Sequence, residues 1–199
     1  AKRHYRAMET MLAEESPDIV VLCSRHPSDH LEQIRLAAEH GCHVYCEKPV
    51  SVFLEEADEI ARVVETTGIK LAMAHPARHD AAYRAMKSMI AGGDIGTPLT
   101  AIGHGKCDHR GGGEDLIVLG THILDLLTFF FGAPDSVVAD VREGRQPATV
   151  PSRIETVEPV GPALGDEVFA VFQFPDGVRG IFESRRGLKK PDQPAPHMG

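Results

Sequence analysis

The stretch DIVVLCSRHPSDHLEQIRLAAEHGCHVYCEKPV, residues 18–50, decides the fold of this chain. Two short apolar runs, Ile19 to Cys23 and His43 to Cys46, have the length and residue types of buried strands. Between them, the segment from Asp29 to His40 carries apolar residues at helical spacing and stops at Gly41, as helices commonly do. A strand, a helix and a second strand in this order predict two parallel strands joined by a crossover helix.

The next segment repeats this alternation. Residues 54–67 place apolar side chains on one stripe and stop at Gly68, and residues 70–74 form another strand-like run. The order predicts an α/β fold, a doubly wound parallel sheet with helices on both faces. The three strands should be parallel neighbours whose carboxyl ends share one edge of the sheet. We expect Ser24, Lys48 and His75 at that edge.

After residue 77 the pattern changes, because strands follow one another without intervening helices. We expect, in order, a helix over 81–91, a strand over 99–106, a glycine turn at 111–113, one long helix over 114–131 and strands at 136–142, 168–174 and 178–184. Residues 146–165 are interpreted as a long surface connection. The pattern predicts an α+β domain with an antiparallel or mixed sheet over residues 78–199, after a partial dinucleotide-binding domain over residues 1–77.

Composition excludes several classes of partner. The chain of 199 residues is 42% hydrophobic and 25% charged, and its formal net charge of −8 repels nucleic acid and anionic membranes. It contains neither a run of 18 apolar residues nor a signal peptide. It begins without an initiator Met, already inside a helical pattern over residues 4–15, so we interpret it as an internal fragment. We expect a cytoplasmic location.

The four cysteines lie in or beside apolar, strand-like segments rather than at the spacings of a disulfide framework, which indicates a reducing compartment. They are Cys23, Cys42, Cys46 and Cys107. Cys42, His43 and Cys46 carry donor atoms for a metal, but the sequence offers no second pair of ligands beside them. We therefore interpret them as core residues and predict no metal site.

Lys48 follows a predicted core strand. In open α/β sheets, ligands bind beyond the carboxyl ends of the strands, so Lys48 lies where a ligand would bind. Pro49 restricts the backbone next to it, which favours a positioned amino group. The alternative is an ordinary surface lysine after a strand.

Further blocks follow this stretch, namely IKLAMAHPARHD (69–80), GDIGTPL (93–99), GGGEDLIVLGTHILDLLTFFFG (111–132) and FPDGVRGIFES (174–184). Together with the Glu-Lys-Pro block at 47–49, they make nearly the whole chain resemble the glucose-fructose oxidoreductase, inositol dehydrogenase and MocA (Gfo/Idh/MocA) family. The resemblance implies a Rossmann domain, a C-terminal domain on an open mixed sheet, and NAD- or NADP-dependent oxidoreduction of sugars, cyclitols and related polyols.

The resemblance also implies a cofactor site. Its residues would be Ser24, Arg25, His26, His30, Glu47, Lys48 and Arg78. Three of these have structural alternatives: Glu47 as a structural residue, His30 as a helix-start residue bonded to the backbone, and Arg78 as an interdomain ion pair. No Gly-x-Gly-x-x-Gly turn for the pyrophosphate occurs in these residues, so the choice between NAD and NADP cannot be inferred and cofactor binding should be weak.

Two residues are predicted to be catalytic. The resemblance places Lys48 against the reacting hydroxyl, where its ammonium would stabilise developing negative charge, and makes His122 a general base. The family's aspartate four residues before this histidine is replaced by Val118. Helical spacing puts Asp115 and Asp125 on the face of His122, and we predict that both bind substrate, with Asp125 also orienting the imidazole.

Alternatives remain for several residues and for the function. His122 could be a buried core histidine, and His104 and His109 could line a substrate pocket or only the surface. A related enzyme would use transient oxidation for elimination or glycoside cleavage. A cofactor-binding regulator without turnover is the other alternative, and Val118 favours it. The full-length protein is expected to form a homo-oligomer through its C-terminal sheet.

Overall fold

A computed structural model describes residues 3–187. The backbone divides into two compact units, unit 1 (Ala1–Ala74) and unit 2 (His75–Gly199). Each unit is described by itself.

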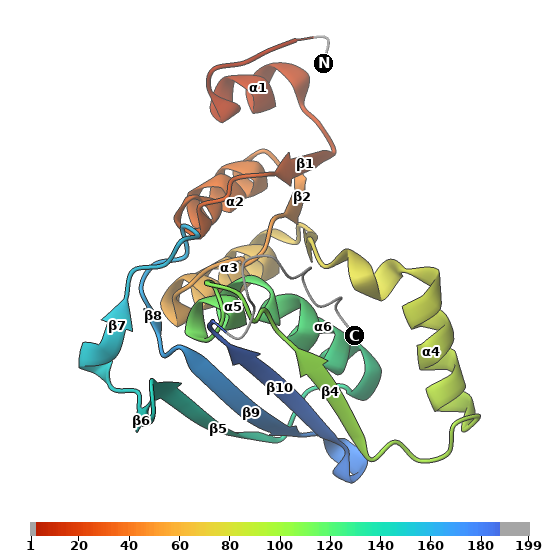
Figure 1. Cartoon of the computed structure of the whole chain (residues 1–199). Helices are drawn as coiled ribbons and strands as arrows, with labels where there is room; N and C mark the ends of the chain where they lie inside the picture. Colours follow the sequence, from red (N-terminus) through yellow and green to blue (C-terminus); the bar gives the residue numbers. More distant parts are fainter. Residues whose placement is uncertain (1–2, 188–199) are drawn as a thin grey trace. The chain divides into compact units, whose positions relative to one another are not determined.

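Unit 1 contains a parallel three-stranded sheet in the order β1-β2-β3, formed by Ile19–Leu22, His43–Cys46 and Leu71–Met73 (Figure 1). The register pairs Val20 with Val44 and Cys46 with Met73. The prediction of three parallel neighbouring strands is confirmed. The connecting helices are α1 (Met8–Glu15), the 3-10 turn η1 (Pro27–Asp29), α2 (His30–Glu39) and α3 (Leu54–Thr67).

The helices of unit 1 differ in one respect from the expectation. The buried strand residues, among them Val20, Val44 and Cys46, belong to one core with α1, α2 and α3, whereas Ile19 and Val21 on the opposite face are 60% and 58% exposed. Both crossovers step in the same direction across the sheet, so right-handed connections put α2 and α3 on the same face. Within residues 3–74 the second face therefore has no helix, and the prediction of helices on both faces was wrong for this part of the sheet.

The cysteines of β2 and its preceding turn belong to this core. Cys42 and Cys46 are 1% and 0% exposed. Burial raises the pKa of the Cys46 thiol to about 12, so the thiol remains protonated and behaves as a small apolar side chain. All four cysteines are free, and residues 3–187 contain no group of three or more metal-ligating side chains.

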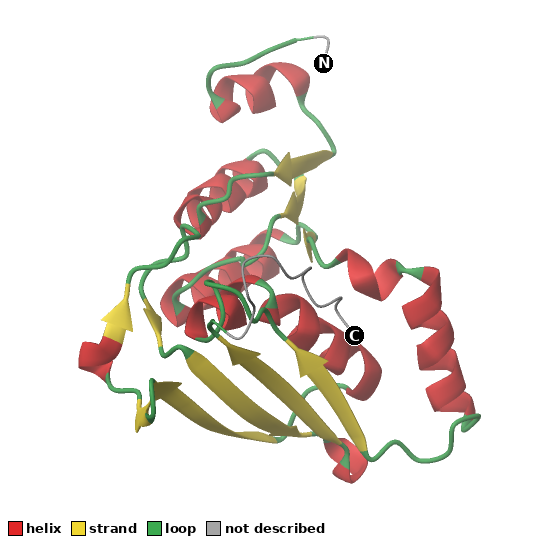
Figure 2. Cartoon of the chain, viewed as in Figure 1, coloured by secondary structure: helices red, strands yellow, loops and turns green. Residues whose placement is uncertain are grey.

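Unit 2 contains a five-stranded sheet in the order β4-β10-β9-β5-β6 (Figure 2). Its strands are β4 (Thr100–His104), β5 (Ser136–Glu143), β6 (Gln146–Pro147), β9 (Glu167–Gln173) and β10 (Arg179–Arg185). β9 and β10 form the predicted hairpin around η4 (Pro175–Gly177), and β4 runs parallel to β10. The sheet is therefore mixed and open.

One face of this sheet is covered by α5 (Gly113–Val118) and α6 (Gly120–Phe131), and η2 (Pro76–His79) and α4 (Ala81–Gly92) precede the sheet in the chain. The core between helices and sheet includes Ile123, Leu127, Ala170 and Phe182. On the uncovered face, Val138 is 75% exposed. Buried and exposed side chains thus lie on opposite faces of the strands, as in a sheet packed on one side only.

Two expectations for unit 2 were wrong. The single helix over 114–131 is two helices, because the intrahelical pattern breaks at Leu119, and His122 N–H bonds to Leu119 O three residues back. The expected surface connection over 146–165 contains η3 (Val150–Ser152) and a small antiparallel pair, β7 (Arg153–Ile154) with β8 (Ala163–Leu164). Val160 in this segment is 4% exposed, so the connection contributes to the packing.

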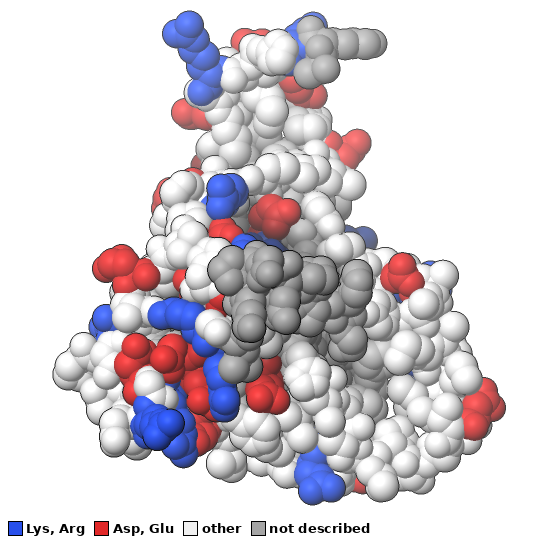
Figure 3. All heavy atoms as spheres, viewed as in Figure 1, with Lys and Arg blue, Asp and Glu red and all other residues white. Residues whose placement is uncertain are grey.

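Charged side chains are interspersed on the visible face. Figure 3 shows Lys and Arg among Asp and Glu, and the described residues on this face form no large patch of one sign. In the part of the chain that the structure describes, no helix is long and apolar enough to cross a membrane.

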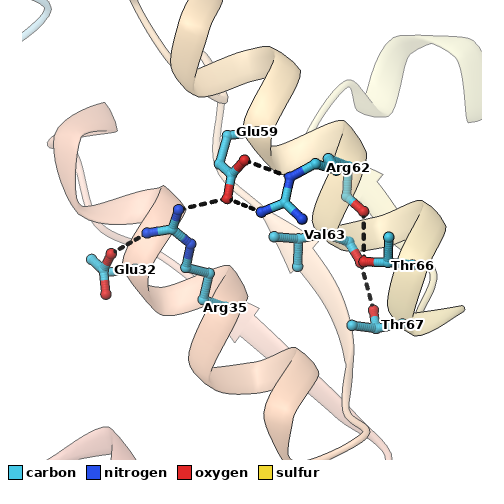
Figure 4. A network of polar contacts seen from close by, with 7 residues as sticks. All are labelled: Glu32, Arg35, Glu59, Arg62, Val63, Thr66 and Thr67. Carbon is cyan, nitrogen blue, oxygen red and sulfur yellow. Dashed lines mark hydrogen bonds and ion pairs between the residues drawn. The ribbon is translucent and has the colours of Figure 1, made fainter.

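A charge network joins α2 to α3 (Figure 4). Arg35 on α2 reaches Glu59 on α3 with 2.6 Å between Nη2 and Oε1, and Arg62 donates to the same carboxylate at 2.7 Å and 2.5 Å. The hydrogen bonds from Arg62 and Arg35 lower the pKa of Glu59 from 4.5 to about 2. The ionised carboxylate is therefore the form that connects the two helices.

Protonation of Glu59 should weaken unit 1. Because its folded-state pKa is depressed, the stabilisation is complete above pH 4.5 and is lost as the pH falls toward about 2. Thermal melts of Glu59→Gln and the parent should differ at pH 7 and converge toward pH 2. Asp58→Asn, at the exposed neighbouring position, is the control and should change the melting temperature little. A Glu59→Gln difference that does not depend on pH would contradict the assignment.

Candidate functional site

The carboxyl ends of β1 and β2 carry the predicted cofactor residues of unit 1. Ser24 Oγ donates to Asp29 Oδ2 at 2.6 Å and accepts from His26 N–H at 3.2 Å, which fixes the loop after β1. Arg25 and His26 are exposed on this loop. These residues therefore offer charged and polar groups at the edge where parallel sheets bind ligands.

His30 is fully buried beneath this edge, at 0% exposure. Its Nδ1 lies 3.1 Å from Val50 O and its Nε2 lies 3.1 Å from Ser24 O. A neutral imidazole donates only one of these bonds, and an imidazolium donates both. In either form the ring ties the loop after β1 to the segment after Lys48. These contacts agree with the structural alternative for His30, a helix-start residue bonded to the backbone. Contact of His30 with a cofactor stays a prediction.

The Glu47-Lys48-Pro49 segment follows β2. Glu47 Oε2 accepts from the Lys48 N–H at 3.1 Å, and the Lys48–Pro49 peptide bond is cis. Lys48 is half-buried and Pro49 is buried. Glu47 therefore has a structural contact within its own segment, and the roles of Glu47 and Lys48 toward a cofactor or substrate stay predictions.

These residues fit one end of a dinucleotide. The polar side chains after β1 and β2 could hold a ribose and the nicotinamide end, with Ser24 and Lys48 as hydrogen-bonding groups. A pyrophosphate needs a glycine turn with free N–H groups, and the sequence contains no Gly-x-Gly-x-x-Gly. Contact of these residues with the ribose or nicotinamide of a cofactor therefore stays a prediction.

In unit 2, the Asp125 carboxylate belongs to a cluster of polar side chains. Asp125 on α6 accepts a two-pronged bond from Arg78, with 2.9 Å between Nε and Oδ2 and a second contact from Nη2 to Oδ1. His75 Nδ1 lies 3.3 Å from Asp125 Oδ1. The rings of His75 and His122 meet edge to face with 5.2 Å between their centroids. His75, Arg78, His122 and Asp125 thus form one cluster.

This arrangement changes the interpretation of two predicted residues. Asp125 contacts Arg78 and His75, and the His75 ring in turn contacts His122; the orienting role of Asp125 toward His122 stays a prediction. Arg78 forms an ion pair within its own unit, in place of the interdomain pair that was considered. Substrate binding by Asp125 and cofactor binding by Arg78 stay predictions.

Sequence reasoning missed His75 as a member of this cluster. Its signal was present, because His75 follows a strand in the same way that Ser24 follows β1. The missing information was its partner, since Asp125 lies in a helix far along the chain and no local spacing connects the two residues.

His122 also lines a pocket of about 460 Å³ between α4, β4 and α6, which we call the α4–α6 pocket. Its walls include Tyr83 and Met86 of α4 and Leu126 and Phe130 of α6. Its size is that of a small-molecule site. His104 is also among the lining residues, whereas His109 is exposed and is not.

Asp115 lies in a buried network away from these pocket walls. It is 0% exposed, and its Oδ2 lies 2.6 Å from the Lys106 N–H donor nitrogen and 2.8 Å from Ser184 Oγ. Ser184 Oγ also accepts from Gly112 N–H at 2.9 Å. Burial is the main cause that raises the pKa of Asp115 above 3.8. Its predicted contact with substrate stays a prediction, and its observed contacts hold the glycine turn.

Glu114 is a second buried acid that the sequence did not single out. It is 1% exposed, and its Oε1 accepts from Val157 N–H at 3.0 Å and Glu158 N–H at 2.9 Å. Its neighbour Asp115 bonds to Lys106 and Ser184, so hydrogen bonds to two different segments fix the start of α5. Buried carboxylates at a helix start accept backbone N–H groups favourably.

The Arg78 and Asp125 pair should be energetically coupled. Arg78→Ala and Asp125→Ala should each lower the free energy of unfolding by about 1–3 kcal/mol, because each leaves a charged partner without its hydrogen bonds. Urea denaturation of the double variant should give a coupling of about 0.5–3 kcal/mol. Arg84→Ala, at an exposed position of α4, is the control. Strict additivity would rule out a direct interaction.

Asp115→Asn should become more favourable relative to the parent as the pH rises. A raised folded-state pKa means that the folded protein binds this proton more tightly than the unfolded chain, so stability is lost as the pH rises from 3.8 through the folded pKa. Melting temperatures from acid to neutral pH should therefore diverge in favour of the asparagine variant. A difference that stays constant across this range would show that Asp115 does not titrate there.

Comparison with known proteins agrees with this architecture. Residues 1–75 match the oxidoreductase family with an NAD-binding Rossmann fold, and residues 83–195 match the GFO/IDH/MocA C-terminal domain. In sequence, the chain is 27% identical over 183 residues to D-glucoside 3-dehydrogenase of Escherichia coli, covering 85% of this chain and 52% of that protein. It is 35% identical over 100 residues to inositol 2-dehydrogenase 1 of Mycolicibacterium vanbaalenii, covering 50% and 28%.

Among solved structures, an NAD binding oxidoreductase from Klebsiella pneumoniae superposes with a TM-score of 0.71 at 24% identity, covering 91% of this chain and 51% of that one. This likeness shows the fold. The chain spans about half the length of that structure and of the E. coli dehydrogenase. With both family matches in sequence order and a parallel sheet followed by a mixed open sheet, the chain belongs to the Gfo/Idh/MocA family of oxidoreductases.

Proposed function

We propose that this chain forms the catalytic part of an NAD- or NADP-dependent dehydrogenase that acts on a hydroxyl or keto carbon of a sugar, cyclitol or related polyol. The observation that carries the proposal is the position of His122. This imidazole lines the α4–α6 pocket and contacts the His75 ring, which in turn lies beside Asp125. A basic nitrogen at a pocket wall, backed by polar groups, is the arrangement expected of a general base.

His122 removes the proton of the reacting hydroxyl in this proposal. The nicotinamide, when bound, supplies the hydride acceptor for the same carbon. His75 holds the orientation of His122 through the edge-to-face contact, and Asp125 with Arg78 fixes His75. In the reverse direction, protonated His122 returns the proton to a keto oxygen.

Lys48 stabilises negative charge on the reacting oxygen. Its ammonium is a compact cation with three donors, suited to an alkoxide that develops as the proton and hydride leave. Pro49 is buried behind it, and Glu47 contacts its backbone N–H, so the segment that carries the amino group is fixed. That Lys48 and His122 face one substrate is part of the proposal.

Val118 favours a second candidate function. It occupies the position where the family resemblance places an aspartate, and its isopropyl group supplies no proton acceptor at this buried position. A cofactor-binding regulator without turnover would tolerate this residue. Retention of Lys48 and His122 favours the dehydrogenase.

The uncovered sheet face supports the proposed homo-oligomer. Val138 and Phe169 lie on this face by strand register and are 75% and 40% exposed. Apolar side chains of this size on an open sheet are commonly covered by a partner surface.

The dehydrogenase proposal can be tested in a chimera in which the first strand and glycine turn of a relative precede Ala1. Reduction of NAD or NADP would be screened against sugars and cyclitols. Lys48→Ala and His122→Ala should each lower the turnover number about 100-fold or more, while the dissociation constant of the cofactor changes little. Because both groups act on one hydroxyl, the double variant should be only slightly slower than the slower single variant.

Val118→Asp provides the matched comparison in the same chimera. If the absence of the family aspartate limits catalysis, this substitution should raise turnover. If Lys48→Ala and His122→Ala both leave turnover within about threefold of the parent, the proposed roles of these residues in acid-base and electrostatic catalysis are wrong. Tight cofactor binding without any turnover would instead support the regulator.

A further inference from the structure

We propose that the substrate carries an apolar ring beside its reacting hydroxyl, and that the α4–α6 pocket binds this ring. The substrate class is then a glycoside with a hydrophobic aglycone rather than a free sugar. This inference rests on the proposed function, because it takes His122 as the group that meets the hydroxyl.

The pocket belongs to unit 2 alone. It lies between α4, β4 and α6, all within residues 75–187, and has a volume of about 460 Å³. Ligand pockets for drug-sized molecules have volumes of about 300–1,000 Å³ and mostly apolar walls. The volume is therefore sufficient for a ring in addition to the part of a ligand that reaches His122.

The walls are poor in hydrogen-bonding side chains. Most lining residues are apolar, among them Met86, Ile123, Leu126, Leu127 and Phe130. Only Tyr83, His104 and His122 bring polar side-chain atoms. A free sugar has a hydroxyl on most of its carbons, and each hydroxyl buried here without a partner would cost about 1–3 kcal/mol. The walls therefore disfavour a sugar ring and favour a hydrocarbon ring.

Aromatic groups at one wall favour an aromatic aglycone. The rings of Tyr83 and Phe130 lie 6.2 Å apart between centroids and are inclined by 57°. A ligand ring that packs against two inclined rings can adopt the edge-to-face or offset arrangements that aromatic pairs prefer. Met86, on the same helix as Tyr83, adds a polarizable side chain that adapts to such rings.

The polar end of the pocket fixes the orientation of the ligand. His122 reaches the lining from α6, and on its other side it meets His75, which Asp125 and Arg78 hold in place. A ligand with both an apolar ring and a hydroxyl can satisfy the walls and His122 together. A molecule with only one of these groups leaves part of the pocket unmatched.

The test compares two ligands on the 199-residue chain without any cofactor. Phenyl β-D-glucoside and methyl β-D-glucoside differ only in the aglycone, and calorimetric titration measures both dissociation constants. Phenyl β-D-glucoside should bind at least about 10-fold more tightly, which is the scale of burying part of one ring in an apolar site. Equal affinities, or no binding of the phenyl glucoside, would overturn the inference.

Two methionines of α4 provide matched variants. Met86 lines the pocket and is 47% exposed, whereas Met89 lies one turn further along the helix, is 44% exposed and is outside the lining. Since both are partly exposed, an aspartate should be tolerated at either position. Met86→Asp should abolish the preference for the phenyl glucoside, and Met89→Asp should leave it unchanged. Equal effects of the two substitutions would show that the ligand binds elsewhere.

The outcome can be separated from that of the proposed function. If the preference for the phenyl glucoside depends on Met86 but the chimera shows no oxidation of any polyol, the pocket assignment holds and the dehydrogenase proposal fails. The opposite result is that the chimera oxidises polyols with Lys48 and His122 essential, while Met86→Asp changes neither the ligand preference nor the Michaelis constant for the phenyl glucoside. In that case the dehydrogenase proposal holds and the aglycone inference fails.

Discussion

The backbone of residues 111–113 passes so close to neighbouring strands that no side chain can be accommodated there, and the arrangement of unit 2 depends on this approach. A Cβ on Gly113 would lie 2.1 Å from Leu164 O, and one on Gly111 would lie 2.5 Å from the Arg185 carbonyl. Gly112 in addition has a φ of 84°, which favours glycine. The turn therefore places the start of α5 between β8 and β10. At the start of α5, Glu114 and Asp115 bind their buried partners. The next helix, α6, then packs on the sheet.

The helix predicted over 114–131 is two helices in the structure, and a glycine lies near the point where they meet. Residues 114–131 have apolar side chains at helical spacing and no proline, so local pattern favours a continuous helix. Gly120 begins the second helix. A Cβ there would lie 3.2 Å from both Asp115 O and the Phe182 ring, so this glycine permits α6 to approach β10. Whether a glycine ends a helix or only permits close packing depends on its neighbours in space, which the sequence pattern does not contain.

The strands and helices of unit 1 could be predicted because their signals are local. Short apolar runs, helical stripes and glycine stops fall at DIVVLC, at residues 30–39 and at Gly68, and the structure follows them within a few residues. The cluster around Asp125 could not be predicted in this way. Arg78 and Asp125 are joined by hydrogen bonds between segments 47 residues apart, and His75 enters only because η2 passes beside α6. Helical spacing suggested His122 as the partner of Asp125, a contact that stays a prediction, and local spacing gave no sign that the two parallel donors of the Arg78 guanidinium would bind this carboxylate.

The Arg78 contact also determines what Asp125 can do for the proposed chemistry. A carboxylate that accepts both prongs of a guanidinium has most of its negative charge compensated, so it stabilises a nearby imidazolium less than a free carboxylate would. Its main contribution is then geometric, because it fixes His75, and His75 limits the positions of the His122 ring. An aspartate at position 118 would have added a negative charge, whereas Val118 adds none. In the proposed chemistry, the imidazolium that forms on His122 would therefore have less negative charge near it than in a site that holds both an aspartate and a histidine on the same helix.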